Sequence, residues 1–439
     1  SEFREIFDSF GATDFLGYLE TSTESRLQAI LVDGKSVTEA NADSEVEIIL
    51  DRTPFYAEGG GQLADGGLIT LANGAVIEVD DVQKPVPGLF VHRGRVISGS
   101  ASVNESALAV INNERRLAIS RAHTGTHMVH KAFREILGES ATQAGSENAP
   151  GRFRFDFPSS GTVAPSVMRD VEDRVNALLL ENLLVTAEEM SQPEAMAMGA
   201  MALFGEKYGE RVRVVSVGDW ARELCGGTHV KSSAELGLVK LLGESSIGAG
   251  VRRVEALVGF DAFNFLAREH VLLNSLTEIV KGSRVEELPE RISDLVERMK
   301  GLEKELATLK SAQALAGASA LLEKSEHVKD IVTIFERVAD GISSDDLRTI
   351  ALDLRNRNAK SVVALISVAD EKVTLVVAVS DSARAEGVKA GSLVKLGSTV
   401  LGGGGGGKDD FAQGGGTKAQ SIADAIEEMK AALRSSVGE

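Results

Sequence analysis

Two pairs of side chains, each with three residues between its members, constrain the fold of this chain most strongly. His123 and His127 form the first pair, and Cys225 and His229, within RELCGGTHV, form the second. Cys225 is the only cysteine among 439 residues. The first pair lies in a segment of helical periodicity, so both imidazoles project from one helix face about one turn apart. Glycines let the second segment turn tightly and approach a ligand closely.

Three imidazoles and one thiolate suit Zn2+, and a zinc thiolate would explain a lone cysteine without a redox role. We therefore expect the two pairs to converge on one zinc ion per chain. Either pair alone is more often a packing feature. His130 lies on the same helical stripe, as a spare ligand or, as we expect, a buried histidine behind the ligands. A protease of the H-E-x-x-H type is excluded, because no glutamate separates His123 from His127.

Composition and periodicity divide most of the chain into three globular regions. Residues 1–102 alternate short apolar runs with glycine- and proline-rich turns, which favours a small β-barrel or sandwich. Residues 103–262 mix helical and strand patterns and predict an α+β domain, with helical periodicity over 103–138. Residues 331–439 predict a separate α/β domain with two buried strands joined by a short turn. The fold class is therefore α+β with several domains.

Residues 263–330 change character and predict a long helical linker. Pro289 is the last proline, so nothing beyond it forbids a long helix. Apolar residues step alternately by three and four, which indicates a helical hairpin or a coiled coil that could join two chains, or else a helix packed on its own domain. The positions of this seam are Ile292, Leu295, Met299, Leu302, Leu306 and Leu309.

Bulk properties exclude several classes of protein. The net charge of -18 argues against a surface that binds nucleic acid generally, although a local basic groove remains compatible with it. A single cysteine forms no internal disulfide, which favours the cytoplasm. No apolar run reaches membrane-spanning length, so no membrane partner is expected. Because the chain begins with Ser1, we expect an excised piece or a processed product.

Several segments, in order along essentially the whole chain, resemble the alanyl-tRNA synthetase family. They are HTGTH with CGGTH, TPFYAEGGGQLADGG (53–67), TQAGSENAPGRFRFDF (142–157), GAGVRRVEAL and GGGGGGKDDFAQGGG. The resemblance implies a β-barrel, an editing domain, a helical linker and a C-terminal DHHA1-type domain. It also implies a class II core ahead of residue 1. ATP would serve only that core, which ligates alanine to tRNA(Ala).

For these residues the resemblance implies hydrolysis of Ser-tRNA(Ala) and Gly-tRNA(Ala), with the two His/Cys pairs as zinc ligands. Cys225 is expected in catalysis, together with Thr142 and Gln143 near the aminoacyl group. Arg252 and Arg253 are expected to meet the tRNA acceptor end, or to form surface ion pairs. Zinc could activate water or position the substrate, and we favour positioning, because four protein ligands leave no open coordination site.

The glycine tract 402–407 and Lys408 form the last candidate site. Backbone N–H groups there could cradle a phosphate, or the tract could be a flexible loop. It is not a P-loop, since Asp409 follows the lysine. It also resembles the glycine-rich loop of DHH phosphoesterases, whose metal motif the chain lacks. The family resemblance implies that this domain contacts tRNA. The helical linker and this domain could also form a homodimer.

Two other readings of the whole chain stay open at this point. One is a tRNA-binding and dimerisation module with a structural zinc. The other is a free-standing editing factor with a C-terminal extension.

Overall fold

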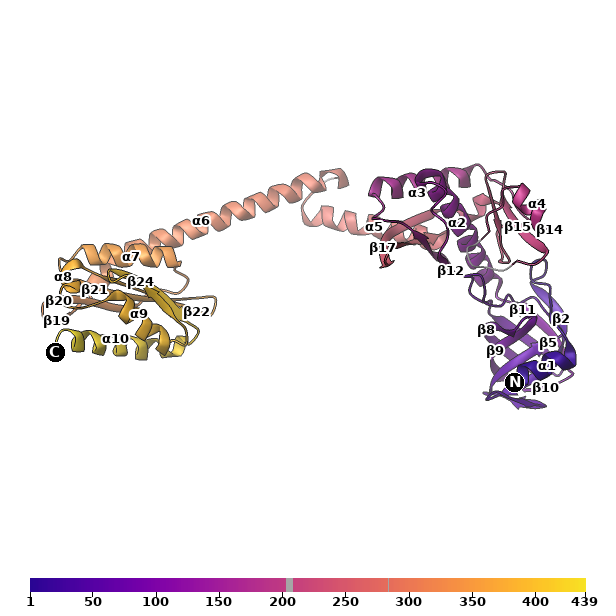
Figure 1. Ribbon diagram of the computed structural model, residues 1–439, viewed down its shortest axis with the longest axis horizontal. Helices are drawn as coiled ribbons and strands as arrows, with labels where there is room; N and C mark the ends of the chain where they lie inside the picture. Colours follow the sequence, from indigo (N-terminus) through magenta and orange to yellow (C-terminus); the bar gives the residue numbers. More distant parts are fainter. Residues whose placement is uncertain (203–207, 283) are drawn as a thin grey trace. The chain divides into compact units, whose positions relative to one another are not determined.

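The structure, a computed structural model, describes residues 1–202, 208–282 and 284–439. The chain forms two compact units, Ser1–Ser275 and Leu276–Glu439 (Figure 1). The first unit contains a β-barrel and an α+β part, and the second contains a long helix and a six-stranded sheet. This division is coarser than the four domains expected from the sequence, whose boundaries stay predictions.

A closed barrel occupies the start of the first unit. Its strand order is β11-β7-β8-β9-β5-β2, and β11 also pairs with β2, which closes the ring. The short strand β3 (Lys35–Val37) extends the sheet beside β2. Alternate residues fill the barrel with aliphatic side chains such as Ile48, Ile69 and Ile77. The six strands are β2 (Ser22–Val32), β5 (Glu45–Leu50), β7 (Gly67–Leu71), β8 (Val76–Val86), β9 (Leu89–Ser98) and β11 (Ser106–Ile111).

The helix expected over 103–138 is shorter than its apolar pattern suggested. Helix α2 begins at Asn113, capped by the Asn112 side chain, and ends at Leu137 before Gly138. The preceding segment is strand β11, in which Ala107, Ala109 and Ile111 are buried alternately. Helical periodicity was the wrong interpretation of this segment, because alternation with a period of two matches a barrel strand equally well.

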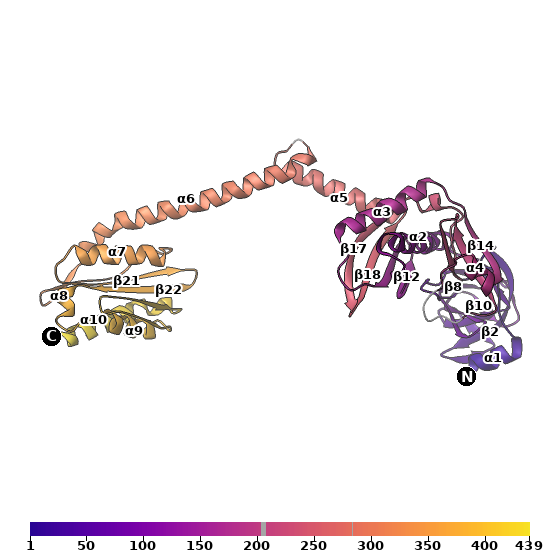
Figure 2. The same ribbon diagram turned by 45° about the horizontal axis from the view of Figure 1, so that its top comes forward.

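An antiparallel sheet packs against α2 and α3 (Pro165–Leu180) in the α+β part (Figure 2). Its order is β12-β13-β18-β17. The expected strand RFRFDFP is β13, whose three phenylalanines are buried in the core that α2 covers. A second sheet, β14-β15-β16, precedes the Cys225 loop. The strands are β12 (Gly145–Ala149), β13 (Arg152–Pro158), β14 (Val185–Ser191), β15 (Arg211–Val217), β16 (Ala221–Leu224), β17 (Val239–Gly248) and β18 (Val251–Val258).

The predicted long helix is present as α6 (Leu288–Leu322), with Pro289 in its first turn. All six seam positions are exposed in the described chain, from 42% for Ile292 to 60% for Leu309. Near its end, Ala318 is buried against α7 (Ser344–Asn356). The helix is confirmed, while pairing through the seam stays a prediction.

The second unit is a sheet of order β19-β20-β21-β22-β24-β23, covered on both faces. Helices α6 and α7 pack on one face, and α9 (Ala390–Val400) and α10 (Ile422–Ser436) on the other. Part of the glycine tract is not a loop, because Gly405–Gly407 form β23 against β24. Within the described residues, no helix has the length and apolar character to cross a bilayer. The strands are β19 (Glu326–Val328), β20 (Ile331–Arg337), β21 (Ser361–Ala369), β22 (Lys372–Val379), β23 (Gly405–Gly407) and β24 (Phe411–Gly416).

The barrel contains a buried histidine that should make its stability depend on pH. Burial lowers the pKa of His92 from 6.5 to about 4. His92 therefore becomes protonated below about pH 6.5 in the unfolded chain, but only below about pH 4 in the folded barrel. Stability from this group is complete above pH 6.5 and falls as the pH drops toward 4. Between pH 6.5 and pH 4, the free energy of unfolding of His92→Gln should fall by up to about 3 kcal/mol less than that of the unchanged chain.

The measurement is denaturant unfolding of the chelator-treated chain at several pH values, followed by the fluorescence of Trp220, the only tryptophan. The control is His270→Gln, which changes an exposed histidine. An unchanged pH profile in His92→Gln would show that another group carries the dependence.

Candidate metal centre

The two sequence pairs meet in the folded chain. His123 and His127 project from α2, and Cys225 and His229 come from the loop that follows β16. Their donor atoms all lie within 4.8 Å of one another. The Cys225 Sγ atom is 3.3 Å from His123 Nε2 and 3.4 Å from His229 Nε2. This spacing fits four donors around one metal ion.

Glycine is required where the loop passes the helix. A Cβ atom on Gly227 would lie 2.1 Å from Cε1 of His123. A side chain there would therefore push the helix and the loop apart. Gly125, between the two helical histidines, similarly lets Phe153 of β13 approach α2, since its Cβ would be 3.0 Å from that ring. The glycines of both motifs serve the close packing that brings the four donors together.

Groups outside the four donors fix the orientation of two imidazoles. The Nδ1 atom of His123 is 2.8 Å from the Gln62 Oε1 atom. The Nδ1 atom of His229 is 2.9 Å from the Thr124 hydroxyl. Both rings consequently turn Nε2 toward Cys225. Such outer partners fix the tautomer and orientation of metal-bound histidines.

Gln62 was not singled out from the sequence, although it lies in the segment EGGGQLADGG. It comes from the barrel loop before β7, and its Nε2 donates to the Thr228 hydroxyl. Its Oε1 also accepts from the Thr228 backbone N–H. One barrel side chain thus joins the helix that carries His123 to the loop that carries Cys225. The three preceding glycines were the only sequence signal of a close approach.

Glu223 is a second residue that sequence reasoning missed. Its Oε2 atom lies 3.2 Å from Nε2 of His127, and its Oε1 accepts a 2.5 Å hydrogen bond from Nδ1 of His130. Burial would raise the pKa of this carboxyl, but His127 and His130 together lower it to about 2. His130 is buried behind the donors and is not one of the four grouped donors, as expected.

The three grouped imidazoles favour the neutral form that a metal ligand needs. Burial is the main cause that lowers the pKa of His123 and of His229 well below 6.5. Burial also lowers the pKa of His127, with Glu223 opposing the shift. At neutral pH each imidazole therefore has one ring nitrogen without a proton, which can bind a metal.

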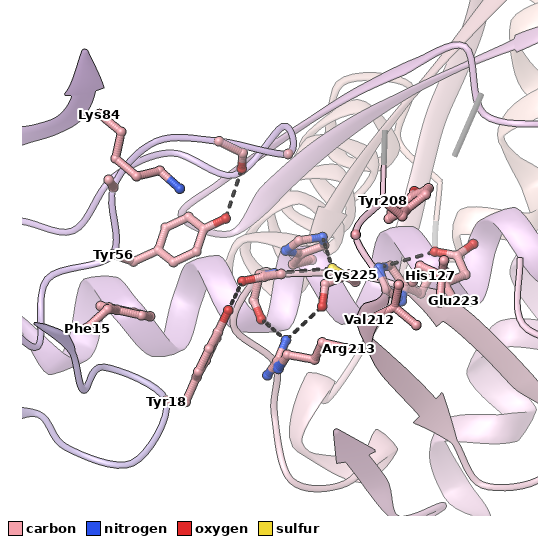
Figure 3. A pocket seen from close by; sticks show the side chains of 18 of the residues that line it. Phe15, Tyr18, Tyr56, Lys84, His127, Tyr208, Val212, Arg213, Glu223 and Cys225 are labelled. Carbon is pink, nitrogen blue, oxygen red and sulfur yellow. Dashed lines mark hydrogen bonds and ion pairs between the residues drawn. The ribbon is translucent and has the colours of Figure 1, made fainter. Parts of the chain in front are cut away.

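A pocket of about 380 Å³ is lined by three of the four donor residues, His123, His127 and Cys225 (Figure 3). The α+β part supplies His127, Arg213, Glu223 and Cys225. The barrel and the segment before β2 supply Phe15, Tyr18, Tyr56 and Lys84. Gln143 is among the described residues that line it, and its Nε2 donates to the Ser146 hydroxyl. Thr142, its neighbour, is not among the lining residues.

The remaining predicted site residues lie elsewhere. Arg252 forms an ion pair with Glu244, and Arg253 forms a two-pronged pair with Asp156. Their role in tRNA contact stays a prediction. Lys408 belongs to the second unit, where its side chain is exposed and its backbone N–H donates to the Phe411 carbonyl.

Three family descriptions match separate parts of the chain. Residues 2–115 match tRNA synthetases class II (A). Residues 212–255, which contain Cys225 and His229, match the threonyl and alanyl tRNA synthetase second additional domain. Residues 328–435 match the DHHA1 domain.

Individual proteins are similar over nearly the whole chain. An alanine–tRNA ligase from a Nocardioides species is 56% identical over 97% of this chain and 48% of its own length. One from Acidothermus cellulolyticus is 55% identical over 97% of this chain and 48% of its own. The chain thus spans about half the length of the curated relatives it matches. The solved C-Ala domain of the Aquifex aeolicus alanyl-tRNA synthetase is 32% identical over 25% of this chain and 97% of that domain, with a TM-score of 0.24.

The hydrogen bonds of Gln62 predict a role in metal affinity. Gln62→Ala removes the partner of His123 Nδ1 and the link to Thr228, so His123 loses its fixed orientation. We expect metal affinity to fall roughly 10- to 100-fold. Titration of the purified chain with Co2+, followed by its visible absorption, measures this affinity.

Gln83→Ala, which changes a glutamine of β8 outside the site, is the matched control for Gln62→Ala. Equal affinities for Gln62→Ala and the unchanged chain would mean that His123 is oriented without this bond.

Proposed function

We propose, from the premise that the chain belongs to the alanyl-tRNA synthetase family, that its metal centre hydrolyses the ester of tRNA(Ala) mischarged with serine or glycine. The observation that carries the proposal is the cluster of His123, His127, Cys225 and His229, three of which also line a pocket. The relatives are alanine–tRNA ligases, and the proposal for this chain is hydrolysis only.

The metal in this proposal is Zn2+, one per chain. The donor set of three imidazoles and a thiolate suits this ion, and neutral imidazole is the form of histidine that binds it. Zinc bound there would act as a Lewis acid that attracts the polar groups of an aminoacyl ester. Because four side chains already fill a tetrahedral set, we assign it mainly to positioning of the substrate.

The residues of the chain would perform the remaining tasks. Gln143 lines the pocket and offers an amide that can hold the aminoacyl group or a water molecule. Thr142, expected near the aminoacyl group, does not line the pocket, so we assign it no direct contact. A synthetic pocket built for alanine rejects glycine and serine poorly. The hydrolytic site must therefore cleave the seryl and glycyl esters and spare the alanyl ester. Removal of the wrong ester at a second site supplies the missing discrimination.

The partners in this proposal follow from the same family. The chain would bind tRNA(Ala) in the cytoplasm, with Arg252 and Arg253 near the acceptor end and Lys408 on the second unit. The exposed seam of α6 would support a homodimer. Its six apolar side chains lie on the surface of the described chain, where a second helix could cover them.

A second candidate function is a tRNA-binding module whose zinc is structural. The closed set of four ligands favours it, because structural zinc sites are fully coordinated by protein while catalytic sites keep an open position. The pocket beside the donors is the observation that favours catalysis instead.

Hydrolysis of Ser-tRNA(Ala) and Ala-tRNA(Ala) by the purified chain separates the two functions. We expect selective loss of the seryl ester and about one zinc per chain, because one set of four protein ligands binds a single ion. Cys225→Ala should lower the deacylation rate at least 100-fold, roughly the loss that follows removal of a key catalytic group. Lys231→Ala, an exposed residue just past the motif, should leave the rate unchanged.

Circular dichroism of each variant shows whether it is folded, so that only folded proteins are compared. If the zinc-loaded chain spares both esters, the zinc is structural and the hydrolytic proposal is wrong.

Replacement of the metal tests its role in the reaction. If zinc mainly positions the substrate, Co2+ and Cd2+ forms should deacylate Ser-tRNA(Ala) at rates that do not follow the acidity of metal-bound water. The pH profiles of the three forms supply the comparison. A profile that shifts with each metal's acidity would assign water activation to the metal instead.

A further inference from the structure

Two side chains hold the backbone carbonyls of the Cys225 loop, the loop that follows β16 (Figure 3). Arg213 of β15 donates to the carbonyl of Cys225 at 3.0 Å and to the carbonyl of Gly227 at 2.8 Å. The Tyr18 hydroxyl donates to the carbonyl of Gly226, which lies between them in the chain. Three successive carbonyls of the loop are therefore bonded to side chains.

The two side chains that hold these carbonyls also support each other. The Arg213 guanidinium lies 3.9 Å from the centroid of the Tyr18 ring, which is a cation–π contact. The backbone carbonyl of Arg213 accepts from the N–H of Cys225 at 3.0 Å. Tyr18 comes from the segment before β2, whereas Arg213 belongs to β15. The loop is thus fixed from two separate parts of the first unit, so its backbone is preorganised.

The N–H groups of the loop point away from the side chains that hold the carbonyls. In a trans peptide the N–H lies opposite the carbonyl of the same planar unit. The N–H of Gly227 is 3.3 Å from Cys225 Sγ. The N–H of Thr228 donates at 2.8 Å to Gln62 Oε1, which also meets His123 Nδ1. Both N–H groups therefore meet the metal donors or a residue that orients them.

The N–H of Gly226 differs from the next two, because it has no hydrogen-bond partner among the residues that the structure describes. Gly226 is exposed and lines the pocket beside Cys225. Its N–H belongs to the peptide whose carbonyl is bonded to Arg213, so its direction is fixed. A preorganised N–H on a residue that lines a pocket can bind an oxygen atom on which negative charge develops.

We propose that the backbone N–H of Gly226 is a catalytic donor to the carbonyl oxygen of the ester, and that Arg213 and Tyr18 are the positioning residues that aim it. The inference rests on the proposed function and adds a catalytic group to it. The three consecutive bonds that hold the loop prepare this donor before substrate arrives, so no reorganisation is needed during the reaction.

The donor acts on one oxygen during ester hydrolysis. The oxygen of a water molecule bonds to the ester carbon, and the carbonyl oxygen takes up the negative charge of the tetrahedral intermediate. The N–H of Gly226 stabilises this negative oxygen. The bond to the ribose oxygen then breaks, and the ribose takes one proton of the water. The other proton is released, and the amino acid leaves as a carboxylate.

A backbone substitution tests the donor directly. Lactic acid in place of alanine at position 226 puts an oxygen where the N–H was, and the matched reference is Gly226→Ala. The methyl group has room, because the nearest atom to a Cβ on Gly226 is the Tyr18 hydroxyl oxygen at 3.8 Å. The single-turnover rate constant for Ser-tRNA(Ala) should be roughly 100- to 1,000-fold lower for the lactate form than for Gly226→Ala, the loss typical of one oxyanion donor.

The same pair of substitutions at Gly161 supplies the control. Gly161 is exposed, lies outside the site, and has no atom within 4 Å of a Cβ. Its lactate form should deacylate Ser-tRNA(Ala) as fast as Gly161→Ala does. Co2+ titration of both Gly226 forms, followed by visible absorption, reports the metal site separately, and we expect equal Co2+ affinities.

The positioning role of Tyr18 has its own test. Tyr18→Phe removes the bond to the Gly226 carbonyl and should lower the rate constant roughly 2- to 12-fold, the worth of one hydrogen bond, without a change in the half-saturating enzyme concentration. In the lactate form the same substitution should have no further effect, because the donor that Tyr18 aims is already absent. Additive losses would show that Tyr18 acts independently of this N–H and would overturn its positioning role.

The comparison of the two Gly226 forms decides the catalytic role. Equal rates would overturn the proposal even if the unchanged chain hydrolyses Ser-tRNA(Ala). Loss of Co2+ binding in the lactate form alone would assign the N–H to holding the metal-binding loop and would also overturn it.

Failure of the proposed function is distinguished by a binding experiment. If the unchanged chain hydrolyses no ester, the probe is an analogue of the seryl ester in which a tetrahedral phosphonate replaces the carbonyl. Binding that is roughly 10- to 150-fold weaker in the lactate form than in Gly226→Ala, the range for a hydrogen bond to a charged group, would support the donor. Equal binding would overturn it.

Discussion

A buried ion pair between Arg116 and Asp65 is the interaction on which the candidate site depends. Both side chains are less than a tenth exposed. Arg116 lies in α2, seven residues before His123, and Asp65 lies in the barrel, three residues after Gln62. Arg116 also donates to the carbonyls of Gly17 and Pro54. Each of its three guanidinium nitrogens thereby donates a hydrogen bond, which reduces the cost of burying the charge.

This pair joins the barrel to α2, the helix that carries His123 and His127. Removal of one partner of a buried pair costs about 3–5 kcal/mol, because the other charge stays buried without compensation. In this chain the effect would extend beyond stability. Gln62 reaches His123 only while its loop is held against α2, and Tyr18 reaches Gly226 from the segment that contains Gly17. The barrel is therefore a structural part of the candidate metal centre.

The sequence predicted the features that depend on local spacing. His123 and His127 share a helix face because their spacing matches the helical repeat, and the glycines around Cys225 indicated a tight loop. Gln62 and Glu223 could not be found in this way, since their roles arise from contacts between distant elements. Strand β11 was read as helix because its apolar residues fit both periods. The glycines 405–407 form a strand because pairing with β24 replaces the side-chain packing that a strand usually needs.

The opposite charges of the pocket and the chain bear on how an RNA would reach the site. Most of the surface of an acidic protein repels a polyanion, so non-specific association is weak. A cluster of Lys84, Arg211 and Arg213 at one pocket acts within about one Debye length, roughly 8 Å at physiological salt. A phosphate within this range is attracted, while phosphates farther away are screened from the cluster. The positive charge of the described pocket lining is thus a local feature of an acidic chain.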